Sequence, residues 1–112
     1  MKMYTNSEQT AKLIELGFAP KMRINGVCTK YGIVNVEHET YFDVGELIEM
    51  LPKELEKYNW DFYSINIYFD TFIWNVCYKN RKGQIAYQTS SIEELVNALF
   101  EMAVKLKEDG VI

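Results

Sequence analysis

The feature of the sequence that most constrains the fold is a stretch of alternating apolar and polar residues at positions 60–89. Successive side chains of a strand point to opposite faces of a sheet, and β-branched and aromatic residues suit a half-buried strand. Breaks at Asp70-Thr71 and at the charged residues 80–83 divide the stretch into three segments. We therefore predict a three-stranded antiparallel meander that begins at Trp60. Its apolar face carries Ile65, Ile67, Phe69, Phe72, Trp74, Val76, Tyr78, Ile85 and Tyr87.

Helical periodicity predicts a helix near each end of the chain. The first spans residues 8–16, with Asn6 or Ser7 as the N-cap, and the last has Ser90 or Ser91 as its N-cap. Both have apolar stripes that predict burial. The buried contacts of the first helix are expected to be Leu13, Ile14 and Phe18, and those of the last Ile92, Leu95, Val96, Leu99, Met102, Ala103 and Leu106.

A central helix is indicated by Asp43 and Glu46, which have the spacing of a capping box. Pro52 ends or kinks this helix, and we expect residues 53–58 to form a further helical turn that carries Leu55. The core-facing stripe of the central helix is predicted to be Val44, Leu47, Ile48 and Leu51.

Residues 21–42 predict a hairpin with strands at about 24–30 and 33–41. Both Asn25-Gly26 and Tyr31-Gly32 are plausible turns. The pattern leaves open whether this hairpin joins the meander or forms a separate ribbon.

The predicted order is α-β-β-α-β-β-β-α, in one domain that spans residues 1–112. Connections between strands are short, which favours antiparallel pairing. We expect the α+β class, with a single antiparallel sheet of four or five strands and the helices on one of its faces.

The net charge of −4 is unevenly distributed along the 112 residues. Residues 37–61 contain eight acids and two lysines, a net charge of −6. Nucleic-acid binding needs a basic face, which the sequence does not supply. No stretch approaches the roughly 20 apolar residues of a membrane helix, and residues 1–7 lack the apolar core of a signal peptide. We expect a cytoplasmic protein that binds neither nucleic acid nor membrane.

The residue types that carry chemistry are sparse. There is one histidine, His38, and there are two cysteines, Cys28 and Cys77, which is too few for an evident metal site or an activated thiol. The six glycines stand singly and form no phosphate-binding loop. We expect no cofactor, no metal and no catalytic residue, and therefore a protein that is not an enzyme.

The polar face of the meander is the candidate interaction surface. It carries neutral amides beside tyrosine, a composition found at interface cores, although one solvated face is also normal for an antiparallel sheet. The candidate residues are Tyr68, Ile73, Asn75, Cys77 and Ala86.

Residues 45–52 (GELIEMLP) and 93–112, with the aromatic hairpin between them, resemble small uncharacterised proteins of gut Bacteroides-type bacteria. Those proteins are often encoded by phages or other mobile elements and have no assigned activity. The resemblance therefore implies a bacterial setting and an accessory role for a mobile element, and it assigns no catalytic residue.

The leading hypothesis is a small non-enzymatic interaction module that binds a protein partner or a second copy of itself as a homodimer. One alternative is an inhibitor that presents the acids of residues 37–61 to a host nucleic-acid enzyme as a phosphate-like surface. Another is a ligand-binding or enzymatic domain with a pocket at Trp60, Tyr63 or Trp74 and a buried acid.

Overall fold

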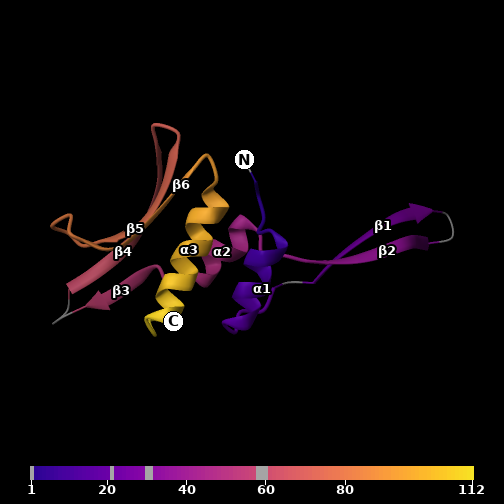
Figure 1. Ribbon diagram of the computed structural model, residues 1–112, viewed down its shortest axis with the longest axis horizontal. Coiled ribbons are helices and arrows are strands. Elements are labelled where there is room, and N and C mark those ends of the chain that lie inside the picture. Colours follow the sequence, from indigo (N-terminus) through magenta and orange to yellow (C-terminus); the bar gives the residue numbers. More distant parts are fainter. Residues whose placement is uncertain (1, 21, 30–31, 58–60) are drawn as a thin grey trace.

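The computed structural model describes residues 2–20, 22–29, 32–57 and 61–112 (Figure 1). Within these residues the order of elements is α-β-β-α-β-β-β-β-α. The helices are α1 (Ser7–Glu15), α2 (Val44–Met50) and α3 (Leu95–Glu108). The strands are β1 (Met22–Thr29), β2 (Gly32–Thr40), β3 (Glu54–Lys57), β4 (Asp61–Asp70), β5 (Ile73–Lys79) and β6 (Ile85–Ile92). In the described part of the chain, no helix is long and apolar enough to cross a membrane.

The main sheet has four antiparallel strands in the order β3-β4-β5-β6. The predicted α+β class, the single main sheet and the meander of β4, β5 and β6 are thereby confirmed. Trp60, the predicted start of the meander, lies outside the described residues. The sheet, α3, and then α2 with α1 follow one another as layers, so the helices lie on one face of the sheet (Figure 1).

The further helical turn predicted for residues 53–58 is wrong, because β3 forms there instead. Leu55 is buried opposite the buried Tyr63, and it alternates with the exposed Glu54 and Glu56. This is the two-residue period of a strand with one core-facing side. Pro52 does follow the end of α2, as predicted.

The hairpin of β1 and β2 forms a separate two-stranded ribbon that projects from the body of the molecule (Figure 1). Asn25-Gly26 is not its turn, because the register between the strands shifts between Asn25 and Val27 and pairing continues to Thr29 and Gly32. Gly26 therefore lies opposite a bulge. Tyr31, in the other predicted turn, lies outside the described residues.

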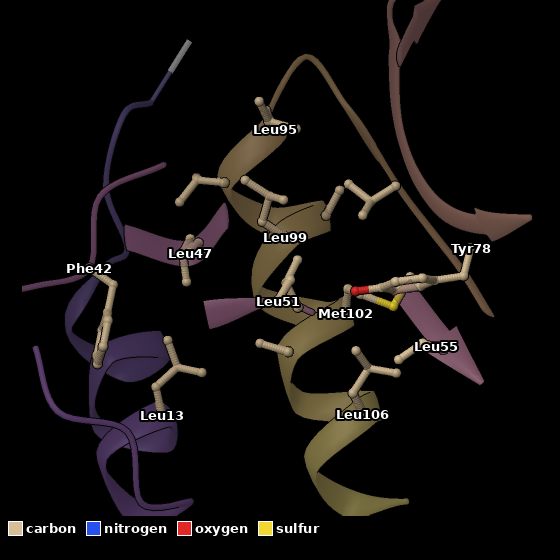
Figure 2. Close-up of a cluster of buried hydrophobic side chains, with 14 of the residues drawn as sticks. Leu13, Phe42, Leu47, Leu51, Leu55, Tyr78, Leu95, Leu99, Met102 and Leu106 are labelled. Carbon is tan, nitrogen blue, oxygen red and sulfur yellow. The ribbon is translucent and has the colours of Figure 1, made fainter. Parts of the chain in front are cut away.

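α3 carries most of the hydrophobic core. Figure 2 shows its residues Leu99, Met102 and Leu106 between Tyr78 and Leu55 of the sheet on one side and Leu13 and Leu47 on the other. Polar contacts fix α1 to α3 as well: Gln9 Nε2 donates to Asn97 Oδ1 at 2.8 Å. The buried residues of α3 are Leu95, Val96, Ala98, Leu99, Met102, Ala103 and Leu106.

Two of the three predicted helix caps are confirmed. Asn6, rather than Ser7, caps α1, and Asp43 forms a capping box with Glu46 at the start of α2. The cap predicted for α3 at Ser90 or Ser91 is wrong, because both serines belong to β6. The hydroxyl of Ser90 instead donates to Asn75 Oδ1 at 2.7 Å, an interaction between neighbouring strands.

Some predicted core positions are exposed. Ile14 and Ile48 lie on the outer sides of α1 and α2. Ile85 leaves the apolar face because the register of β5 and β6 shifts after the pair Tyr78 and Tyr87, which makes Ala86 the extra residue of a bulge. Phe72 and Ile92 lie at the end of the sheet and are also exposed.

The central position of α3 predicts a large effect of Leu99→Ala. Removal of this fully buried side chain should lower the free energy of unfolding by about 3 kcal/mol, because buried methyl groups are lost and a cavity remains. The exposed Glu101 of the same helix is the control, and Glu101→Ala should change stability by less than about 0.5 kcal/mol. Urea denaturation measures both, and equal effects would contradict a core centred on α3.

Candidate functional site

The outer face of the main sheet, opposite α3, contains four of the five residues predicted as an interaction surface, whereas the fifth, Ala86, lies in the bulge of β6 and packs against the core. Tyr68 is partly exposed, and the Lys79 ammonium lies 5.1 Å from the centre of its ring. Ile73 and Ala86 are half-buried. Asn75 and Cys77 are buried. The five residues are therefore not equally available to a partner.

Polar contacts between strands close the middle of this face. The side-chain oxygen of Asn75 accepts from Ser90 Oγ at 2.7 Å and from Gln88 Nε2 at 3.4 Å. Cys77 lies between its cross-strand neighbours Asn66 and Gln88 and is fully covered. Burial raises the pKa of the Cys77 thiol, and the positive charge of Lys79 partly opposes this effect. The thiol is thus protonated and inert at neutral pH.

A group of apolar side chains lies at the β4–β5 end of the sheet. We call it the aromatic tip, and it consists of the exposed Phe69, Phe72 and Ile92 and the half-buried Ile73 and Trp74. Phe69 is 51% exposed, Phe72 67% and Ile92 70%. The tip is at the top of Figure 1, close to the start of α3. Clusters of exposed apolar residues on a soluble protein commonly mark interaction sites.

The tip is exposed because the cover of α3 ends below it. Along the inner face of β5, Tyr78 and Val76 are fully buried and Trp74 is half-buried. Phe69, the cross-strand neighbour of Trp74, is half-exposed, and the centres of the two rings are 5.0 Å apart. Phe72 meets Phe69 edge-on at 6.5 Å. Trp74 still packs against the hydrophobic core, and the contacts with its ring hold Phe69 and, through Phe69, Phe72 in place beyond the covered part of the sheet.

The turn that presents Phe72 has a strained backbone. Thr71 and Phe72 form a two-residue hairpin loop with φ of 47° and 64°, the signature of a type I′ turn. Such turns favour Asn-Gly, because a β-branched or bulky residue in the left-handed region costs about 1–2 kcal/mol. The carbonyl oxygen of Phe72 accepts from the backbone N–H of Glu93 at 2.9 Å, which fastens the turn to the end of β6.

Acidic residues surround the tip. Asp70 precedes the turn and accepts from Thr71 Oγ1 at 3.1 Å. Glu93 and Glu94 follow β6, and Glu94 accepts from the backbone nitrogen of Lys2 at 2.7 Å. The tip therefore combines apolar side chains with three carboxylates.

A second feature of the outer face is a hollow at the opposite end of the strands, with a volume of about 870 Å³. It lies between β3, β4 and the turn after β5, and we call it the outer hollow. Its wall includes Glu54, Asp61, Phe62, Lys79, Arg81 and Lys82.

The turn that borders the outer hollow is held by Asn80, which is buried. Its side-chain oxygen accepts from the backbone nitrogens of Lys82 and Gln84 at 3.0 and 2.9 Å. Its amide nitrogen donates to Asp61 Oδ2 at 3.1 Å. The turn is therefore a fixed support for the basic side chains at residues 81 and 82.

No catalytic arrangement is evident in the described residues. Glu46 is their one buried acid, and its side chain belongs to the capping box of α2. No group of three or more His, Cys, Asp or Glu among them lies close enough to share a metal ion. The side chains of Cys28 and His38 lie outside the described part.

Of the three residues named for an alternative pocket, Tyr63 belongs to the hydrophobic core, Trp74 packs against that core, and Trp60 lies outside the described residues. Comparison with known proteins found no family model, no curated protein and no solved structure that matches the chain.

Of the tip residues, only Ile73 was predicted from the sequence to lie on an interaction surface, because Phe69, Phe72 and Trp74 fit the alternation of a core face. One signal was available. The break at residues 71–72 contains neither Gly nor Asn, which is unusual for a two-residue hairpin loop.

The strain in the turn predicts that Thr71→Asn/Phe72→Gly stabilises the protein by about 1 kcal/mol, since both new residues tolerate a positive φ. Thr71→Asn alone should give part of this gain and keep the exposed ring. Urea denaturation measures both variants. A double variant less stable than the wild type would show that the turn is not strained.

The burial of Cys77 predicts slow reaction with a thiol reagent. In a Cys28→Ala background at pH 8, labelling by Ellman's reagent should be at least about 100-fold slower in the native state than in urea, because the strands must open first. Stopped-flow absorbance gives both rates. Similar rates would place the thiol at the accessible surface.

Proposed function

We propose that this protein is a small cytoplasmic, non-enzymatic interaction module that docks onto a protein partner through the aromatic tip. The observation that carries the proposal is the exposure of Phe69, Phe72 and Ile92 on a strained turn. Strain of this kind persists where it serves a function, and Asn-Gly would relieve it here.

The chemistry of the tip supports this role. Aromatic residues are enriched at the centres of interfaces, where they fill pockets on the partner. The contacts of Phe69 with Trp74 and Phe72 fix the rings before binding, so less conformational entropy is lost when the partner engages. The tip therefore has the features of an anchor.

The part of the outer face that lies beside the tip belongs to the same proposed docking surface. Ile73 belongs to both surfaces, and Tyr68 lies in the next row of β4, opposite Asn75. Asn75 and Cys77 are covered, so they support this surface from below and do not touch the partner. Ala86 lies toward the other end of the sheet, in the bulge of β6.

The resemblance to proteins of phages and other mobile elements suggests the setting of this interaction. The partner would then be a protein of the host or of the element, and the module an accessory factor. The three carboxylates around the tip favour a partner whose pocket has a basic rim.

Affinity capture from the native host tests the role of the tip. Immobilised wild-type protein should retain a stoichiometric partner, and Phe72→Ser should retain at least about 30-fold less, as expected for the loss of a hot spot of 2 kcal/mol. Ile14→Ser is the control, because Ile14 is an exposed apolar residue of α1. Quantitative mass spectrometry measures capture. Equal capture by the wild type and Phe72→Ser would contradict the proposal.

A further inference from the structure

We propose that the partner of the aromatic tip is a second copy of the chain, whose outer hollow receives it. This inference rests on the proposed function, because it takes the tip to be a docking element. It extends that function by naming the occupant of the hollow.

The shapes of the two surfaces fit this pairing. The outer hollow has a volume of about 870 Å³, within the range of pockets that enclose a drug-sized group. The aromatic ring of Phe62, 44% exposed, supplies an apolar contact in its wall. Phe72 is 67% exposed at the turn between β4 and β5, so its ring is free to enter a hollow of this size.

The charges of the two surfaces are complementary. The tip is bordered by Asp70, Glu93 and Glu94, whereas Lys79, Arg81 and Lys82 outnumber Glu54 and Asp61 at the hollow. Asp61 keeps its charge when it accepts from the amide of Asn80, so the wall of the hollow has a small excess of positive charge, and its exposed bases Arg81 and Lys82 lie at the turn.

Within the described residues these charges form no ion pair, because the one ion pair there joins Lys12 and Glu108. Another molecule can therefore form ion pairs with Asp70, Arg81 and Lys82. A contact between them brings opposite charges to the edge of an apolar centre, which is the usual arrangement of an interface.

The two surfaces lie at opposite ends of the sheet. β5 begins at Ile73 in the tip and ends at Lys79 in the hollow, so the tip cannot reach the hollow of its own copy. Two copies can make this contact reciprocally, each tip in the hollow of the other, which closes a dimer with two-fold symmetry. A contact made only once per pair repeats from copy to copy as a ring or a filament instead. The inference thus predicts self-association through tip and hollow, as a closed dimer or as a larger ring or filament.

Sedimentation velocity from about 1 µM to about 1 mM tests this assembly. The weight-average mass of the wild type should rise with concentration above that of the monomer, and high salt should reduce it. Phe72→Ser, which disables the tip, and Arg81→Glu/Lys82→Glu, which disables the hollow, should each stay monomeric. Ile14→Ser should assemble like the wild type.

A mixture of the two disabled proteins is the decisive arm. Phe72→Ser retains an intact hollow and Arg81→Glu/Lys82→Glu retains an intact tip, so an equal mixture should form a dimer and nothing larger. This result also shows that both variants are folded. A monomeric wild type at the highest concentration, a mixture that stays monomeric, or assembly that survives the hollow substitutions would overturn the inference.

The outcome is separable from that of the proposed function. Capture of a different protein that needs Phe72 but not Arg81 and Lys82 would keep the tip as a docking element and overturn its pairing with a second copy. Self-assembly that needs all three residues would support both.

Discussion

The burial of α3 on two sides is the constraint on which the rest of the structure depends. The sheet packs on one side of the helix, and α1 and α2 pack on the other, so seven of its fourteen residues are buried. A helix with so wide an apolar surface cannot be covered by one layer. The capped helices α1 and α2 are short, and packing on α3 is what gives them stability in water.

The same helix also determines where the body of the protein ends. Fourteen residues of α-helix extend about 21 Å, whereas the ten residues of β4 extend about 33 Å. α3 therefore cannot cover the whole length of the hairpin, whatever angle it makes with the strands. Trp74 packs at the edge of the covered part, and its cross-strand neighbour Phe69 continues the alternation of the core-facing side beyond that edge. The aromatic tip is thus a consequence of unequal lengths, and the strained turn adds Phe72 to it.

Much of the fold was predictable from local signals. The meander, the ribbon strands, the ends of α1 and α2 and the buried stripe of α3 all follow from periodicity and capping chemistry in the sequence. Two errors have one physical origin, which is pairing between strands. The residues around Leu55 are too few for their pattern to distinguish a strand from a helical turn. They form a strand because Leu55 pairs with Tyr63 on β4. Ser90 has the chemistry of a helix cap, but Asn75 on the neighbouring strand takes its hydroxyl.

For the candidate site, the sequence predicted on which face of the sheet a residue lies, but not whether its side chain is exposed. Alternation correctly separates Tyr68 and Cys77 from the core-facing side, because the face of a residue depends only on its own strand. Exposure depends on the neighbours: Cys77 is short and lies below Asn66 and Gln88, so it is covered on the open face of the sheet. The reverse holds for Phe69, whose alternation predicts the core although no helix reaches it. Sequence periodicity gives the direction of a side chain, and the length of the element packed against it decides whether that side chain is core or surface.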